Sequence, residues 1–283
     1  MTVSRKLKTF LAIPTVTLLG VAGWTVLAPA TAAEFQGLGD LPGGPFWSNA
    51  FGVSDDGQTV LGNSKDGSPG WQAVRWTADT GIEALGALPG GVDNWRQAWA
   101  STSDGSIIVG ESGGQAFVWD EDNGMTSLAG PRGFATGISN DGTVIVGHAP
   151  NVKAYRWTQE TGAVGLGALP DHSGVTFPLD VSGDGSVVVG YGGEPFRWTE
   201  ETGMVGLGEF GKDQIEDSRA WGVSDDGAVV VGRGFDENGV LQAFRWTAED
   251  GMQGLGFVPG GGTHDSAARA ASSDGRGVIS VRR

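Results

Sequence analysis

The chain alternates short apolar runs with glycine-rich turns over most of its length. In residues 243–247, Phe244 and Trp246 fall on one face of an extended strand, and Arg245 falls on the other. Runs of β-branched residues such as Val229–Val231 favour strands as well. No segment after residue 32 shows a helical period. The pattern therefore predicts an all-β protein.

One tryptophan-centred unit is copied five times in the same register. In every copy a glycine follows the tryptophan after five residues, and a leucine follows it after nine. These tryptophans are Trp76, Trp119, Trp157, Trp198 and Trp246. A spacing that holds five times indicates that a single supersecondary unit is repeated along the chain.

An Asp-Gly pair marks each unit and a partial sixth one. Asp-Gly between extended runs is a strong signal for a β-hairpin, because glycine adopts positive φ angles without strain. The aspartates are Asp56, Asp104, Asp141, Asp184, Asp226 and Asp274, and they lie 37 to 48 residues apart. This spacing is typical of propeller blades. A second glycine follows five residues after the first, except that Ser280 takes its place in the sixth copy.

Each complete unit contains four predicted strands, so two architectures are open. Such units either close into a β-propeller or stack as an open β-solenoid. We favour the propeller, because both faces of the predicted sheets are apolar and closure removes exposed edges. Five units are complete. Residues 35–39 match a lone fourth strand and residues 268–281 match the first two, so we predict a composite sixth blade that closes the ring. A truncated C-terminus is the alternative.

The turn after each repeat tryptophan also has constant chemistry. Threonine follows the tryptophan in four copies, and Asp120 follows it in the second copy. Such side chains cap the backbone N–H groups of a turn. The third residue after the tryptophan is always acidic, and it can pair with the preceding arginine, as Asp79 can with Arg75. We interpret these acids as structural.

Residues 1–32 have the pattern of a secretory signal peptide. Arg5, Lys6 and Lys8 precede an apolar run, and residues 30–32 form an Ala-x-Ala cleavage site. The apolar run is long for a signal, so an uncleaved N-terminal anchor is the alternative. We expect residues 33–283 to form a single propeller domain, secreted or periplasmic, that does not insert into the membrane after cleavage.

Charge and composition exclude several classes of function. Removal of residues 1–32 leaves 15 basic and 33 acidic side chains, a net charge of −18. This charge opposes binding to nucleic acid or to an anionic membrane. The chain has no cysteine, which excludes disulfides and thiol catalysis.

The combined repeat pattern is more specific than any of its parts. It consists of Val-Ser-Asp-Asp-Gly from Val223, residues 243–247 and 251–256, and the Leu-Pro-Gly-Gly links that begin at Leu41 and Leu88. This pattern resembles the HAF-type extracellular repeat of exported bacterial proteins, and the match covers residues 35–283. The resemblance implies an extracellular or envelope repeat protein, and it supplies no catalytic residues.

Few residues have the spacing of a metal or catalytic site. His148, His172 and His264 do not stand at metal-ligand spacing from one another, and we expect no cofactor. Calcium is the metal that the acidic turns best allow, although none of them completes a calcium-binding loop. The candidate ligands are Asp55 with Asp56, Asp180 with Asp184, and residues 120–122.

A hydrolase or lyase acting on polysaccharide or glycoconjugate is the alternative function. Its catalytic carboxylates should depart from the repeat, because repeated acids recur in the same geometry around the whole ring. The acids that depart from the repeat are Asp93, Asp171, Asp213, Glu216, Asp236 and Glu237.

Variable loops favour a binding function instead. The loops between second and third strands share one end of a propeller with the links between units, and they vary in length. Binding residues concentrate on such loops, and exposed aromatic rings stack on sugars or contact peptides. The candidate ligand-binding residues are Trp47, Trp71, Trp95, His148, His172, Tyr191, Asp236 and His264.

We predict a non-enzymatic binding or scaffolding protein at the cell envelope or outside the cell, whose partner is an extracellular glycan or protein. A passenger fragment of a larger surface protein is a third possibility.

Overall fold

The structure is a computed structural model that describes residues 36–90, 94–128, 132–170, 174–208, 217–257 and 265–282. The chain divides into two units, Met1–Gly37 and Leu38–Arg283, and the second unit contains all of the strands. The fold is all-β, as the alternation of the sequence predicts. No helix within the described ranges has the length and apolar character to cross a membrane.

The strands form six antiparallel sheets, and within each sheet they are ordered as in the chain. The first sheet contains β1 (Ser48–Val53), β2 (Thr59–Ser64), β3 (Gln72–Thr77) and β4 (Gly81–Ala84), and the second contains β5 (Arg96–Ser101), β6 (Ile108–Ser112), β7 (Gln115–Asp120) and β8 (Gly124–Ser127). The third contains β9 (Phe134–Ile138), β10 (Ile145–Ala149), β11 (Lys153–Thr158) and β12 (Gly162–Gly165), and the fourth contains β13 (Phe177–Val181), β14 (Val187–Tyr191), β15 (Pro195–Thr199) and β16 (Gly203–Gly206). The fifth contains β17 (Arg219–Val223), β18 (Val230–Phe235), β19 (Leu241–Thr247) and β20 (Gly251–Gly254), and the sixth contains β21 (Ser266–Ala271) and β22 (Val278–Arg282).

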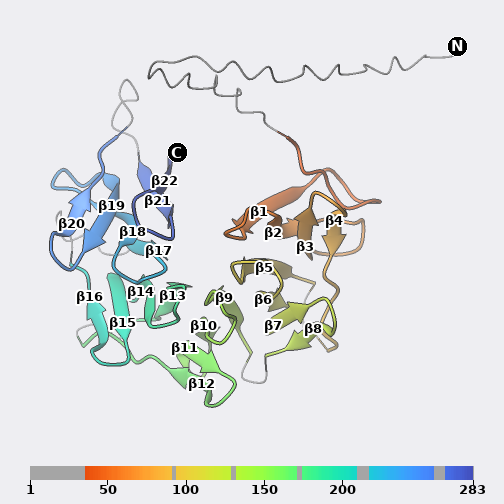
Figure 1. The fold of residues 1–283 in the computed structure, drawn as a ribbon, viewed down its shortest axis with the longest axis horizontal. Coiled ribbons are helices and arrows are strands. Elements are labelled where there is room, and N and C mark those ends of the chain that lie inside the picture. The colour runs from red at the N-terminus through yellow and green to blue at the C-terminus, as the bar shows by residue number, and fades with distance from the viewer. Residues whose placement is uncertain are drawn as a thin grey trace, which may run out of the picture. The chain divides into compact units, whose positions relative to one another are not determined.

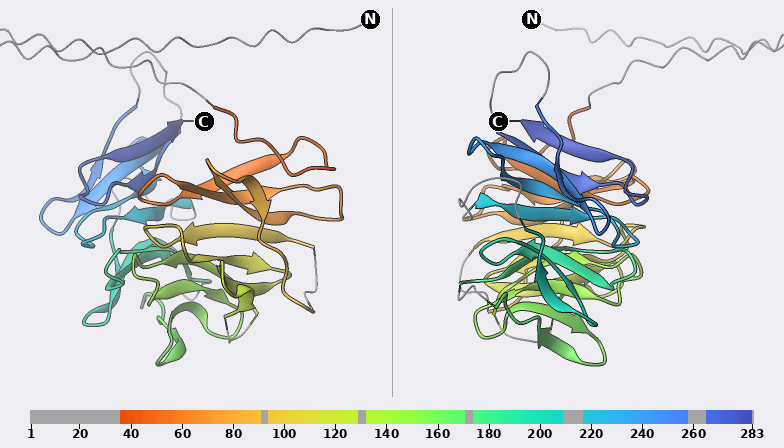
Figure 2. Two further views of the ribbon diagram at one scale, coloured as in Figure 1. Left: turned by 45° about the vertical axis from the view of Figure 1, so that its right-hand side comes forward. Right: turned by 90° about the vertical axis from the view of Figure 1, so that its left-hand side faces the viewer.

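The sheets of the second unit follow one another around a common axis (Figure 1). The first strand of each sheet lies innermost, and the fourth strand of the complete sheets lies outermost. Figure 2 shows the same sheets from two further sides. Each sheet packs against the next one in the chain through its inner strands. This arrangement is a β-propeller of four-stranded blades, and the predicted fold class is confirmed.

The sixth sheet differs from the predicted composite blade. Its described part consists of β21 and β22 alone, and residues 36–40 form no strand, while Phe35 lies outside the described residues. In the complete sheets the fourth strand pairs with a third strand, and the described part of the sixth sheet contains no third strand for the N-terminal segment to pair with. Leu255 shows the consequence: it is 45% exposed, whereas its four repeat equivalents are 5–8% exposed. The equivalent Leu85 packs in one cluster with Phe117 of β7, a third strand of the next sheet.

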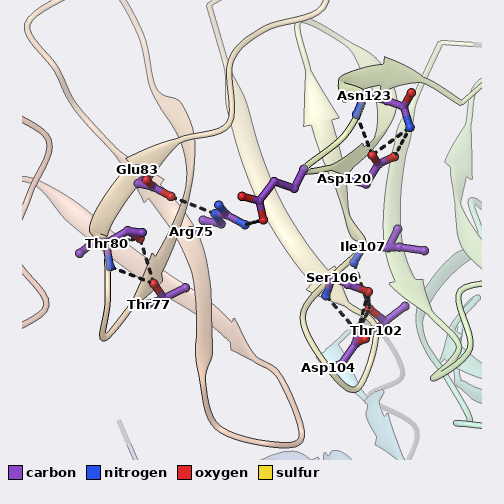
Figure 3. A network of polar contacts seen from close by, with 12 residues as sticks. Arg75, Thr77, Thr80, Glu83, Thr102, Asp104, Ser106, Ile107, Asp120 and Asn123 are labelled. Carbon is purple, nitrogen blue, oxygen red and sulfur yellow. Dashed lines mark hydrogen bonds and ion pairs between the residues drawn. The ribbon is translucent and has the colours of Figure 1, made fainter.

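The hairpin between the first and second strands is built in the same way six times. A hydroxyl at the end of the first strand accepts the N–H that opens the second strand and donates to the aspartate of the Asp-Gly pair. The hydroxyls belong to Ser54, Thr102, Ser139, Ser182, Ser224 and Ser272. The glycine of each pair has a φ between 66° and 74°, which confirms that it is needed for the turn. Figure 3 shows one of these turns, with Asp104 at its centre.

A β-bulge interrupts every innermost strand at the same repeat position. The register between first and second strands shifts by one residue, which leaves the bulged residue without a partner. The second repeat glycine packs against this bulge, and a Cβ atom at Gly190 would overlap the carbonyl oxygen of Phe177. This close approach explains why the position is glycine in all five complete copies.

Apolar clusters lie between adjacent sheets, not within single ones. One cluster joins Leu61 and Ala73 of the first sheet to Ile108, Phe117 and Trp119 of the second, and the other clusters repeat this arrangement. Burying a side chain of this size stabilises a fold by about 2 to 3 kcal/mol. Each sheet therefore depends on its neighbours for its core.

The turn after each repeat tryptophan is capped as predicted. The side chain after the tryptophan accepts a backbone N–H three residues further on, in all five copies. Arg75 makes ion pairs with Glu83 at 3.0 Å and with Glu121 at 3.8 Å, so its expected pairing with Asp79 is not observed. Glu83 is the strand partner of Arg75 on β4, which brings its carboxylate closer than the turn acid. Figure 3 shows these contacts.

Candidate functional site

Three tryptophans from separate loops come together beside the first and second sheets. Trp47 precedes β1, Trp71 precedes β3 and Trp95 precedes β5, so all three lie at the end with variable loops. The rings of Trp47 and Trp71 are 6.4 Å apart and 13° from parallel, and Trp95 meets Trp71 edge-on at 6.1 Å. We call these three residues the tryptophan surface.

The tryptophan surface is open to solvent. Trp47 is 60% exposed and Trp95 is 44% exposed, and the neighbouring Phe46 is 92% exposed. Lys65 places its Nζ atom 5.1 Å from the ring centres of both Trp47 and Trp71. The lysine holds these two indoles in place, because an ammonium group is attracted to aromatic faces.

A polar network connects residues that follow two of these tryptophans in the chain, Gln72 after Trp71 and Arg96 after Trp95. Ser68 donates to the carboxylate of Asp66, and Gln72 donates to Ser68 at 2.8 Å. Arg96 donates to Gln72 through Nη1 at 3.3 Å, while its Nε atom is buried without a hydrogen-bond partner. Hydrogen bonding from Ser68 lowers the pKa of Asp66. The network therefore offers an ionised carboxylate, an amide and a guanidinium side by side.

Two more predicted residues belong to a second aromatic group on the third and fourth sheets. His148 lies between Phe134 at 5.5 Å and Phe177 at 4.4 Å, and Phe177 stacks on Tyr191 at 5.1 Å. Arg219 covers the Tyr191 ring at 4.4 Å. Burial lowers the pKa of His148, so this histidine is neutral at pH 7. All of these residues are half-buried, and the group packs the ends of neighbouring strands against one another.

The remaining predicted site residues have different surroundings. The carboxylate of Asp236 accepts the N–H groups of Asn238 and Val240, so it caps the turn between β18 and β19. His172 and His264 lie outside the described residues. The structure thus brings the three tryptophans together and places His148 with Tyr191 in a separate group.

The innermost strands enclose a cavity of about 580 Å³ along the propeller axis, which we call the axial cavity. All six bulged residues line it: Phe51, Trp99, Thr136, Leu179, Trp221 and Arg269. Bulges re-aim side chains, and here each of them directs one residue to the same cavity. Phe51 stacks on Trp99 at 4.7 Å, and the guanidinium of Arg269 lies 3.7 Å from the centre of Trp221.

Carboxylates from three sheets also line the axial cavity. Asp55 and Asp225 precede the aspartate of the hairpin turn in their copies, and Asn140 at the same position donates to Asp225 at 3.0 Å. Asp180 stands where the other five copies have glycine or alanine. It accepts the N–H of Val181 at 2.9 Å and, across the joint between sheets, the N–H of Val223 at 3.0 Å.

From the sequence, Asp180 is named only as a candidate calcium ligand. It is not included among the acids that depart from the repeat. Burial raises its pKa to about 7, and the charges of Asp225 and Asp55 act in the same direction. Burial also raises the pKa of Asp55, with Asp225 as the next cause. The alignment of the copies contained the signal, because a carboxylate alone interrupts a column of small residues there.

Three of the expected calcium ligands have partners within their own turns. Asp56 and Asp184 accept hydrogen bonds inside their hairpins, and Asp120 caps its turn. Within the described ranges, no three His, Asp or Glu side chains are grouped closely enough to hold a metal ion. Of the acids that depart from the repeat, Glu237 is exposed, whereas Asp93, Asp171, Asp213 and Glu216 lie outside the described residues.

The comparisons with known proteins concern the fold. No family model matches the chain, and no curated protein matches it. TolB from Acinetobacter baumannii is similar with a TM-score of 0.50 and 15% identity, over 71% of this chain and 51% of that one. This chain therefore spans about half the length of that protein. A TolB described as putative from Agrobacterium tumefaciens has a TM-score of 0.51 and 16% identity, over 84% and 90% of the two chains.

A third similar structure is that of the RRP9 WD40 repeats. It has a TM-score of 0.50 and 14% identity, over 81% of this chain and 71% of that one. At these identities the likenesses show a shared propeller fold.

Proposed function

We propose that this protein is an exported, non-enzymatic binding module that holds a glycan on the tryptophan surface. The observation that carries the proposal is the convergence of Trp47, Trp71 and Trp95 from three separate loops. Exposed tryptophan is costly in water, and a cluster of it on a soluble domain marks an interaction site. The surrounding propeller holds the loops that present it.

The chemistry beside the tryptophans supports a glycan over a protein partner. Sugars need flat apolar faces for their C–H groups and hydrogen-bonding groups for their hydroxyls. The indole rings supply the faces, and the network of Asp66, Gln72 and Arg96 supplies donors and acceptors. Protein interfaces are also enriched in aromatic side chains. The polar network next to the tryptophans in the chain is therefore the feature that favours a glycan.

The arrangement of carboxylates favours binding over catalysis. A glycosidase needs a proton donor with a raised pKa and a second carboxylate across the scissile bond. Asp180 has a raised pKa, but both of its oxygens accept backbone N–H groups. We assign it to the joint between two sheets, and we assign no catalytic pair among the described residues.

The proposal includes export from the cell and membership of a family of extracellular repeat proteins. The basic start, apolar run and Ala-x-Ala site of residues 1–32 support secretion through a cleavable signal peptide. The repeat pattern supports membership of the HAF-type extracellular repeat proteins. A net charge of −18 after cleavage suits a soluble protein that meets neutral glycans outside the cell.

A glycan array followed by calorimetry tests the proposed function. The purified protein should bind at least one glycan class, and Trp47→Ala and Trp95→Ala should each weaken that binding about tenfold, because each removes a stacking face. Val205→Ala is the matched control, since Val205 is 49% exposed on the distant strand β16. Absence of glycan binding, or equal affinity of the tryptophan variants and the control, would refute the proposal.

A further inference from the structure

The axial cavity combines aromatic walls with three carboxylates and one guanidinium, that of Arg269. Phe51 and Trp99 stack as one wall and Trp221 forms another. Asp55, Asp180 and Asp225 come from three different sheets, and their charges act on one another. Among the described residues these three carboxylates outnumber the one guanidinium that lines the cavity, so the lining is acidic.

The spacing of the carboxylates favours a larger cation than a metal ion. Among the described residues no set of three acids is grouped tightly enough for metal coordination. An organic cation is not subject to this restriction, because its charge is spread over several atoms and it can face carboxylates on different sheets. The cavity volume of about 580 Å³ accommodates a small organic group.

Arg269 provides the second, independent observation. Its guanidinium carbon lies over the Trp221 ring, 3.7 Å from the ring centre, and both residues line the axial cavity. Guanidinium groups stack on aromatic rings and make paired hydrogen bonds with carboxylates. The cavity thus already holds one guanidinium against an aromatic wall, while Phe51 and Trp99 form an equivalent wall in the first and second sheets.

Two polar atoms of the wall also lack partners. The indole nitrogen of Trp99 and the hydroxyl of Ser101 are buried without a hydrogen bond, and both residues line the axial cavity. Buried polar groups normally have partners. A guanidinium group carries N–H donors and no acceptor, so a ligand of this kind can donate to the hydroxyl of Ser101 but cannot serve the indole N–H of Trp99.

We propose that the axial cavity binds an organic cation of the alkylguanidinium type, stacked on Phe51 and Trp99 with its charge facing Asp55 and Asp225. This site is separate from the tryptophan surface and extends the proposed function. The same chemistry is available from a free small molecule and from an arginine side chain on a partner protein.

Calorimetry with two probes tests the site and distinguishes these sources. Ethylguanidinium chloride represents the free cation, and a blocked Gly-Arg-Gly peptide represents the side chain; both are titrated at low salt and pH 7.5, with sodium chloride as the salt control. Binding of one cation per protein is expected. Tighter binding of the peptide would identify a partner arginine as the ligand, and binding of ethylguanidinium alone would identify a small molecule.

Three variants locate the binding. Asp55→Asn and Asp225→Asn each remove a charge, and Phe51→Leu removes the stacking face; each should weaken binding about tenfold. Asn retains an oxygen that accepts the hydrogen bond of Asn140, so the fold is preserved. Asp79→Asn, on an exposed turn, is the charge-matched control, and Trp47→Ala separates this site from the tryptophan surface. No heat beyond the salt control, or full affinity in both aspartate variants, would overturn the inference.

Discussion

Replacement of Asp180 by alanine tests how the joint between the fourth and fifth sheets responds to pH. Alanine is the natural residue at the same repeat position in β5 and β21, so the smaller side chain fits the backbone. The variant loses the acceptor for the N–H of Val223. It also loses the carboxyl group whose pKa is raised to about 7.

The sign of the effect follows from the raised pKa. The ordinary pKa of 3.8 applies to the unfolded chain, and about 7 applies to the folded one. The unfolded state therefore releases this proton first, and stability is lost as pH rises from about 4 to about 7, with no further loss above that. Each pH unit inside this window costs about 1.4 kcal/mol. Between pH 5 and pH 7.5 the wild-type protein should lose roughly 2 to 3 kcal/mol through this group.

The variant should not show this loss. At pH 5 it is less stable than wild type, because an unpaired buried N–H costs about 1 to 3 kcal/mol. By pH 7.5 the difference in unfolding free energy between the two proteins should shrink by roughly the 2 to 3 kcal/mol given above. Urea titrations followed by tryptophan fluorescence at pH 5, 6, 7 and 7.5 give the free energies. Asp79→Asn controls for net charge. A constant gap between wild type and Asp180→Ala would refute the raised pKa.

Three other predictions concern the repeat itself. Gly190→Ala should destabilise the protein by about 3 kcal/mol, because its Cβ overlaps the Phe177 carbonyl, whereas Gly174→Ala, with open space around it, should be neutral in the same urea titration. Thr199→Ala should cost about 1 kcal/mol by removing the cap of its turn, and Thr199→Ser should restore stability; equal stabilities would argue against the cap. Hydrogen bonds, first among them the backbone N–H of Ser106, lower the pKa of Asp104 to about 2. The ionised carboxylate of Asp104 therefore contributes to the free energy of unfolding above pH 3.8, and this contribution is lost as pH falls toward 2. The free energy of unfolding of Asp104→Asn should decrease less than that of the wild type between about pH 4 and pH 2, as measured by urea titration.

The fold was predictable from sequence because its determinants are local and repeated. Asp-Gly pairs, the hydroxyl before them and the capping residue after each tryptophan all act within a few residues, and the structure contains every one of these contacts. Because the same hairpin signal occurs six times, comparison of the copies predicts the same strand register for each of them. The sixth sheet was mispredicted because strand pairing depends on a neighbour, and the similarity of residues 35–39 to a fourth strand carries no information about a missing third strand.

The candidate site was predictable only in part. Topology places variable loops at one end, which is why Trp47, Trp71 and Trp95 could be named together. Their mutual stacking and the position of Lys65 between two rings depend on loop conformations that no repeat constrains. The axial cavity was missed for a different reason. Its residues occupy bulges, and a bulge changes the direction of a side chain that simple alternation assigns to a sheet face.

The central claim is that a glycan is held by the tryptophan surface, and side-chain NMR tests it most directly. Each of the ten tryptophans that remain after removal of residues 1–32 gives one indole N–H signal. On addition of the bound glycan, the signals of Trp47, Trp71 and Trp95 should shift, while those of Trp76, Trp119, Trp157, Trp198 and Trp246 should stay in place. Shifts confined to the five repeat tryptophans, or spread evenly over all signals, would contradict the account.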